Sequence, residues 1–131
     1  MSFNADTVVS ILPQFEISEG ADFAKLNDYL DKFYELTSNE EGCVNYAFGI
    51  SDDKKQAVCR ESYKTAAAVA AHLANVGEHL AKHEDFGLKL KAIIVYANAA
   101  NMPEMKEILK DMSGICTFFT QHADGLRKNF S

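Results

Sequence analysis

The sequence contains no cluster of lysine and arginine residues and no long hydrophobic run. Its 131 residues carry a formal net charge of -6, so the basic surface that binds nucleic acid is missing and attraction to anionic membranes is disfavoured. The apolar stretch at 8–12 is too short to span a bilayer and has no basic leader before it. We therefore expect a soluble, cytoplasmic protein that binds neither nucleic acid nor membrane.

Cysteine is also scarce. Cys43, Cys59 and Cys116 are odd in number and form no Cys-x-x-Cys pair, so the sequence indicates neither a disulfide framework nor a zinc set. In a reducing compartment such residues are most often small, buried and apolar. We expect no metal site built from them.

What the sequence does contain is typical of a globular protein. Hydrophobic residues make up 47% and charged residues 24% of the chain, close to the average for folded domains. The length suits one domain with its own core. We therefore expect a single domain over residues 1–131.

Apolar periodicity predicts the order of the elements. Alternating runs predict strands over 7–17, 43–50, 56–63, 88–96 and 115–120. Three- and four-residue spacing and capping residues predict helices over about 18–36, 65–83 and 101–112. Pro13 cannot donate a ladder hydrogen bond, which favours a sheet edge or a bulge for the first strand. The order β-α-β-β-α-β predicts an α+β, ferredoxin-like core over about 7–97, with a C-terminal α-β extension over about 98–131 that ends in a polar tail.

The predicted strands carry large apolar residues on both faces. Val44, Tyr46 and Phe48 alternate with Cys43 and Ala47, yet two helices cover only one face of a four-stranded sheet. A second copy of the sheet is the simplest cover for the other face. We therefore predict a homodimer.

The turn near residue 53 predicts a hairpin register. It places Asn45 opposite Glu61 and Cys43 opposite Tyr63, so that these residues and Cys59 share one face of the sheet. A slip of one residue would turn this set to the other face.

Three segments carry a family resemblance. Residues 37–46, Thr-Ser-Asn-Glu-Glu-Gly-Cys-Val-Asn-Tyr, are similar to a Thr-x-x-Glu-Pro-Gly-Cys-x-x-Tyr motif, with Glu41 in place of proline. Residues 60–63 are similar to Glu-x-Tyr/Trp at the end of the following strand, and 68–72, Ala-Val-Ala-Ala-His, to Ala-x-x-x-His on the next helix. In this order, the segments resemble the antibiotic biosynthesis monooxygenase superfamily, which includes quinol monooxygenase-like enzymes.

The resemblance implies a dimeric α/β-barrel with a cavity in each subunit between helices and sheet. Enzymatic members of the superfamily oxygenate electron-rich aromatics with molecular oxygen, often with no metal or flavin. The function implied for this chain is a small-molecule monooxygenase that acts on a quinol or related aromatic without a cofactor.

Five residues are the candidates for this chemistry. Proton transfer would fall to Glu61 and His72, and substrate contacts to Asn45, Tyr46 and Tyr63. If Glu61 faces inward, burial should raise its pKa and suit it to proton transfer. The alternative is a Glu61 that pairs with an arginine or a helix end, or is simply exposed.

The remaining histidines leave other functions open. His72, His79 and His83 fall on one side of the predicted helix. His79 and His83 are spaced to share a metal, but no further ligand completes a set, and a cationic helix end is the favoured interpretation. A haem-binding or haem-degrading protein, with His72 or His79 on the iron, is one alternative function. A non-catalytic dimer that binds a small ligand is another.

Overall fold

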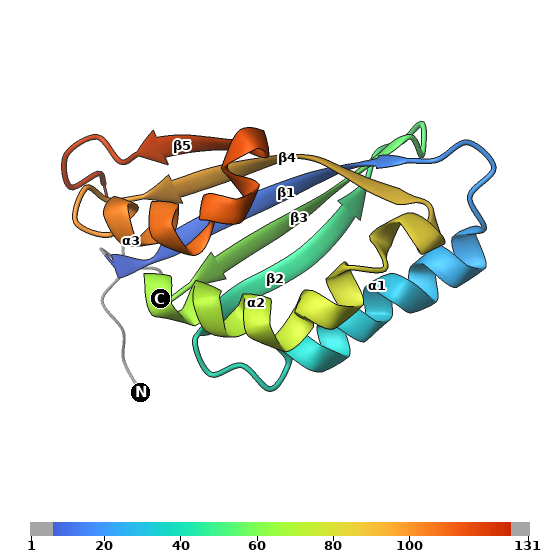
Figure 1. Ribbon diagram of the computed structural model, residues 1–131, viewed down its shortest axis with the longest axis horizontal. Helices are drawn as coiled ribbons and strands as arrows, with labels where there is room; N and C mark the ends of the chain where they lie inside the picture. The colour runs from blue at the N-terminus through green and yellow to red at the C-terminus, as the bar shows by residue number, and fades with distance from the viewer. Residues whose placement is uncertain (1–6, 127–131) are drawn as a thin grey trace.

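The computed structural model describes residues 7–126, which form a five-stranded sheet with its helices on one side (Figure 1). The predicted polar tail beyond residue 126 lies outside the described residues. The elements follow the predicted order and are, along the chain, β1 (Val9–Ile17), α1 (Phe23–Thr37), β2 (Cys43–Ile50), β3 (Gln56–Tyr63), α2 (Ala66–Leu80), the 3₁₀ helix η2 (His83–Phe86), β4 (Leu88–Ala97), α3 (Met102–Ile108), the 3₁₀ helix η3 (Lys110–Ile115) and β5 (Cys116–Thr120).

The strand order confirms the ferredoxin-like α+β fold. The strands lie in the order β2-β3-β1-β4-β5, and β1 to β4 pair antiparallel as the split β-α-β plan requires. The extension adds β5 parallel to β4, with Val95 opposite Phe118. No helix within residues 7–126 is long and apolar enough to cross a membrane.

Pro13 interrupts β1 in an unexpected place. β1 lies in the middle of the sheet, between β3 and β4, which excludes the sheet edge as one of the two predicted alternatives. The predicted irregularity is present, since the pairing with β4 shifts register between Gln14 and Phe15. The pairing with β3 also skips Leu12 and Pro13, between Ile11 and Gln14, so a local break in the ladder accommodates a residue without an N–H inside a central strand.

A second bulge changes the predicted hairpin register. Cys43 does lie opposite Tyr63, but the pairing shifts after it, so that Asn45 pairs with Ser62 and Tyr46 with Glu61. The predicted pairing of Asn45 with Glu61 is wrong by one residue. Because side chains alternate between faces, this shift turns Tyr46 toward the helices and leaves Asn45 exposed.

Side-chain caps set the start of both long helices. Asp22 accepts hydrogen bonds from the backbone N–H groups of Ala24 and Lys25, at 3.0 and 3.2 Å, so α1 begins later than predicted. Thr65 accepts from the N–H of Ala68 and caps α2 as predicted. Helix α2 ends at Leu80, before the expected end near residue 83.

Two adjoining apolar clusters form the core. One packs α1 and α2 on the sheet through Phe15, Leu26, Phe33 and Val76. The other joins the sheet, α2 and the extension, and includes Met102, Met105 and Leu109. The extension therefore contributes to the same core as the ferredoxin-like unit rather than lying apart from it.

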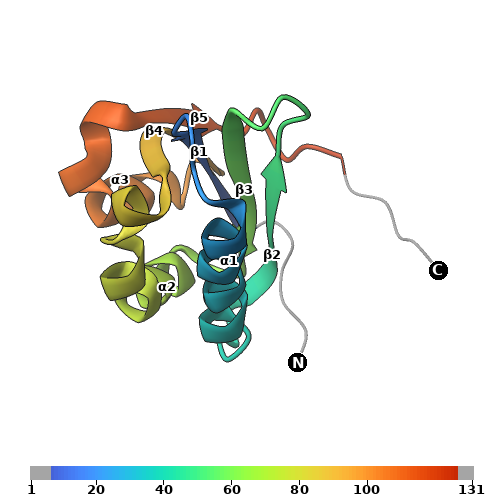
Figure 2. The ribbon, with the colours of Figure 1, turned by 90° about the vertical axis from the view of Figure 1, so that its right-hand side faces the viewer.

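No helix of residues 7–126 covers the opposite face of the sheet. Figure 2 shows the sheet curving around α1, α2 and α3, which all lie on its inner side. Alternation along the strands turns Leu12, Val58 and Ile94 to the outer side. Tyr96 and Phe119 pair there across β4 and β5 and are 42% and 48% exposed.

Gly42 marks a close approach between the start of β2 and the first turn of α2. A Cβ atom added at Gly42 would lie 2.5 Å from the Cβ atom of Ala68, whereas one added at Gly77 within α2 would meet nothing within 4 Å. We expect Gly42→Ala to lower the free energy of unfolding by about 1–3 kcal/mol, because backbone must move to relieve the overlap. The matched variant Gly77→Ala should raise it by about 0.5–1 kcal/mol, since alanine favours a helix interior.

Urea unfolding of both variants and the wild type, at one protein concentration, measures these changes. Equal stability of Gly42→Ala and the wild type would contradict the packing of Gly42 on α2.

Candidate functional site

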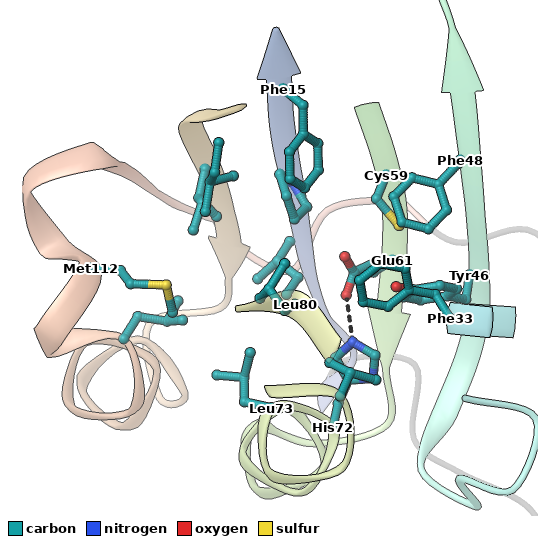
Figure 3. Close-up of a pocket in the computed structure, with 16 residues that line it drawn as sticks. Phe15, Phe33, Tyr46, Phe48, Cys59, Glu61, His72, Leu73, Leu80 and Met112 are labelled. Carbon is teal, nitrogen blue, oxygen red and sulfur yellow. Dashed lines mark ion pairs between the residues drawn. The ribbon is translucent and has the colours of Figure 1, made fainter. Parts of the chain in front are cut away.

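A pocket lies between the inner face of the sheet and the helices (Figure 3). Its space, including the part open to solvent, is about 490 Å³. Its walls are apolar apart from a small polar group of side chains at one end. The lining residues are Ile11, Pro13, Phe15, Phe33, Tyr46, Phe48, Cys59, Glu61, His72, Leu73, Val76, Leu80, Leu90, Ile93, Leu109 and Met112.

Glu61 is the buried acid of this pocket. It projects from β3 to the inner face and is only 3% exposed. Its Oε1 accepts a hydrogen bond from the Tyr63 hydroxyl at 2.6 Å, and the Cys59 thiol is a further hydrogen-bonding neighbour. Burial raises the pKa of Glu61 to about 7, against the lowering effect of these donors. The carboxyl group can therefore both take up and release a proton near neutral pH.

His72 faces Glu61 from α2. Its Nε2 atom lies 3.4 Å from Oε1 of Glu61, the contact drawn as a dashed line in Figure 3. On the other side of the ring, Nδ1 lies 2.8 and 3.0 Å from the two carboxylate oxygens of Glu40. Burial lowers the pKa of His72, while the Glu40 carboxylate opposes that change.

Glu40 completes a chain of three titratable groups. It lies in the loop before β2, and its carboxylate accepts a hydrogen bond from Nδ2 of Asn75 at 2.8 Å. The same Asn75 amide donates to the carbonyl oxygen of Leu36 in α1 at 2.9 Å. Asn75 therefore joins both α1 and the loop to α2. Glu40 belongs to the Thr-x-x-Glu motif, but the motif alone did not indicate that Glu40 would reach a histidine 32 residues away.

The contacts determine which nitrogen of His72 holds its hydrogen. Carboxylate oxygens accept hydrogen bonds, so Nδ1 of His72 donates to Glu40. The Nε2 lone pair then points to Glu61, and a single proton can lie on either of these two groups. A carboxylate-oriented imidazole next to a carboxyl group of raised pKa is an arrangement suited to general acid–base chemistry.

Of the other predicted site residues, one lines the pocket, one is buried beside it and one lies outside it. Tyr46 lines the pocket, and burial raises the pKa of its hydroxyl well above the ordinary value. Tyr63 is fully buried and does not line the pocket; its hydroxyl holds Glu61. Asn45 is exposed outside the pocket. Arg60, the residue preceding Glu61, is exposed while Glu61 itself is buried, so the alternative of an exposed Glu61 is wrong.

The remaining histidines of α2 and η2 make structural contacts. Nε2 of His79 lies 2.9 Å from the carbonyl oxygen of Tyr29, whose hydroxyl donates to the carbonyl oxygen of His79 at 2.7 Å. Nδ1 of His83 lies 2.8 Å from the carbonyl oxygen of Leu88. Within residues 7–126, no three histidine, cysteine, aspartate or glutamate residues are grouped so as to hold a metal ion.

Comparison with known proteins supports the fold. No family model and no curated protein sequence matches the chain. Among solved structures, MupZ from Pseudomonas fluorescens is 27% identical, with a TM-score of 0.77, and the match covers 95% of this chain and 93% of MupZ.

Two further structures match a smaller share of the chain. A proposed antibiotic biosynthesis monooxygenase from Deinococcus radiodurans is 19% identical, with a TM-score of 0.58, covering 70% of this chain and 92% of its own. A point mutant of SnoaB, a cofactor-independent oxygenase from Streptomyces nogalater, is 13% identical with the same TM-score, covering 74% and 98%. The chain thus has the ferredoxin-like fold of antibiotic biosynthesis monooxygenase-like proteins.

The raised pKa of Glu61 predicts a pH-dependent cost to stability. Between the pKa of the unfolded chain near 4.5 and that of the folded chain near 7, the folded state binds more protons, so the free energy of unfolding falls as the pH rises. Relative to Glu61→Gln, the wild type should lose about 2–3 kcal/mol from about pH 5 to about pH 8.

Urea unfolding of the wild type and Glu61→Gln across this pH range measures the difference in their free energies of unfolding. His72 is present in both proteins, so both curves include its titration. Parallel stability curves would show that Glu61 titrates at its ordinary pKa.

Proposed function

We propose that the chain is a cytoplasmic small-molecule monooxygenase of the antibiotic biosynthesis monooxygenase type, which oxygenates a quinol or related aromatic with molecular oxygen. The observation that carries the proposal is the buried chain Glu40–His72–Glu61, with two of its members opening into an apolar pocket. The names of two structural neighbours, a proposed monooxygenase and a cofactor-independent oxygenase, support the same class of reaction.

The pocket suits an aromatic substrate with one acidic hydrogen. Phe33, Tyr46 and Phe48 form an aromatic wall beside Glu61, with ring centroids 5.4 Å apart for Phe33–Phe48 and 5.6 Å for Tyr46–Phe48. Rings pack against such walls in offset or edge-to-face contacts. The apolar surroundings keep water away from a reactive anion, and the few polar groups orient the substrate.

The reaction balances with oxygen as the sole oxidant. His72 and Glu61 take a proton from the substrate, and the resulting anion passes one electron to O2. The two radicals combine into a peroxide on a carbon atom of the substrate. His72 and Glu61 then return the proton to the outer oxygen of that peroxide. The O–O bond breaks as the same carbon loses a second hydrogen, which leaves a carbonyl group and one water molecule. The substrate supplies all four electrons, and one oxygen atom stays in the product.

Oxygen consumption tests this proposal. We expect the wild type to consume O2 with members of a panel of quinols and anthrones, in the presence of EDTA, and to place one ¹⁸O atom from ¹⁸O2 in the product. His72→Ala should lower kcat by about 100- to 10,000-fold, the range for loss of a general base. Asn45→Ala, which changes an exposed residue, should leave kcat/KM unchanged.

Other outcomes of the same assay contradict the proposal. A wild-type rate in His72→Ala would show that His72 takes no part in the proton transfer. Binding of the aromatics with no oxygen uptake across the panel would instead favour the non-catalytic binding protein.

We also propose that two copies pair through the outer face of the sheet as a homodimer. Leu12, Ile94, Tyr96 and Phe119 form an apolar area on that face, and no helix of the described chain covers it. An apolar face of this kind is most simply buried against its own copy about a two-fold axis.

Sedimentation equilibrium tests the pairing. We expect twice the mass of the chain for the wild type and a shift toward the monomer for Ile94→Glu and Tyr96→Glu, because a buried unpaired charge opposes association. Ser113→Glu, which adds the same charge on the helical side, should remain dimeric. Circular dichroism shows whether each variant is folded, and a monomeric wild type would contradict the pairing.

A further inference from the structure

The two ends of the pocket differ in chemistry. At one end, Tyr46, Cys59, Glu61 and His72 bring together all the side-chain oxygen, nitrogen and thiol groups of the lining. The other end is entirely aliphatic apart from one thioether sulfur, and Figure 3 shows Met112 there, across the pocket from Tyr46 and Glu61. We name it the aliphatic end; it consists of five lining residues that pack in the core cluster of the extension, Leu73, Leu90, Ile93, Leu109 and Met112.

Sheet order sets the distance between the two ends. Glu61 lies on β3 and Ile93 on β4, and β1 runs between these strands. Two strand spacings separate them by roughly 10 Å across the sheet. Leu109 and Met112 follow at the far side, beside β4. The lining of the pocket therefore extends further across the sheet than a single aromatic ring beside His72 would reach.

The aliphatic end depends on the extension. Leu109 follows directly after α3, and Met112 lies in η3. The match to MupZ covers 95% of this chain, whereas the matches to the Deinococcus protein and SnoaB cover 70% and 74%. The two smaller values are close to the fraction of the chain that residues 9–97, from β1 to β4, make up. A wall built by the extension is therefore expected to distinguish this pocket from those of the shorter proteins.

From these observations we propose that the substrate is an aromatic that carries an unbranched hydrocarbon tail. The ring lies at Glu61 and His72, and the tail runs under α2 to Leu109 and Met112. The orientation of the ring rests on the proposed function; the place of the tail rests on the lining alone. A hydroxylated or charged tail would lose its water there without gaining a hydrogen bond, so the aliphatic end selects against it.

Binding of 4-alkylphenols tests the place of the tail without any reaction. We expect the dissociation constant, measured by isothermal titration calorimetry, to fall from 4-ethylphenol through the butyl and hexyl compounds, by about fourfold per methylene group as each is buried. The gain should stop once the tail reaches Met112. An octyl compound that binds no more tightly than the ethyl compound would overturn the proposal.

Two matched variants place the tail at the extension. Met112→Trp fills the aliphatic end and should remove most of the gain in affinity from the ethyl to the hexyl compound. The affinity for 4-ethylphenol should stay unchanged. Ser113→Trp adds the same ring at the neighbouring exposed position and should keep the gain. An equal gain in both variants would show that the tail lies elsewhere.

Met112→Ala keeps the test open if the tryptophan variant fails to fold. It lengthens the space, so the preference for octyl over hexyl should rise above that of the wild type. An unchanged preference would overturn the proposal.

Oxygen uptake separates this inference from the proposed function. Tail-dependent binding with no oxygen uptake would leave the aliphatic end in place and contradict the oxygenase. Turnover of quinols at rates and affinities that do not depend on tail length would support the oxygenase. It would overturn the proposal that the substrate carries a hydrocarbon tail bound at the aliphatic end.

Discussion

A carboxyl group buried beneath a helix governs how the inner face of this protein is built. Removing Glu61 from water is costly unless its oxygens find partners, and those partners come from two elements. Tyr63 supplies a hydroxyl from the same strand, His72 an imidazole from α2, and Glu40 holds that imidazole from the loop before β2. The network thereby ties the hairpin, the second helix and the loop to one another.

The same burial makes the site chemically useful. Aromatic and aliphatic walls raise the pKa of Glu61 to about 7 and lower that of His72, so burial favours the uncharged form of each group. In water the carboxyl would lose its proton well below neutral pH. Within the pocket, Glu61 and His72 face the same space, and the apolar walls that shift their pKa values also line that space.

The extension changes the pocket more than it changes the fold. Its strand β5 only lengthens the sheet at one edge, but Leu109 and Met112 become part of the pocket lining. Two shorter proteins of this fold match 70% and 74% of the chain, and MupZ matches 95% of it. Variation in such an added element can alter the lining of a pocket while Glu61 on β3 and His72 on α2 stay in place.

Local sequence patterns were sufficient to predict the order of the elements and several residues of the candidate site. Apolar periodicity, caps and turn residues determined the order of the strands and helices, and the bounds of β2 and β3 in particular. The ferredoxin-like sheet followed from that order. Glu61, His72 and Tyr46 could be chosen because a carboxylate within an apolar strand, and a histidine and a tyrosine at motif positions, are visible along the chain itself.

Contacts between distant segments decided the rest. The bulge after Cys43 turns Tyr46 and Phe48 toward Phe33 and places Asn45 outside the pocket, and no local pattern distinguishes this register from its one-residue neighbour. Glu40 and His72 meet only because the loop before β2 packs on α2. Pro13 lies in a central strand, and the pairing of that strand with β3 skips it. The sequence alone therefore determined which elements form and which side chains are capable of acid–base chemistry. Tertiary packing determined which of them face one another, because side-chain direction depends on register and on long-range contact.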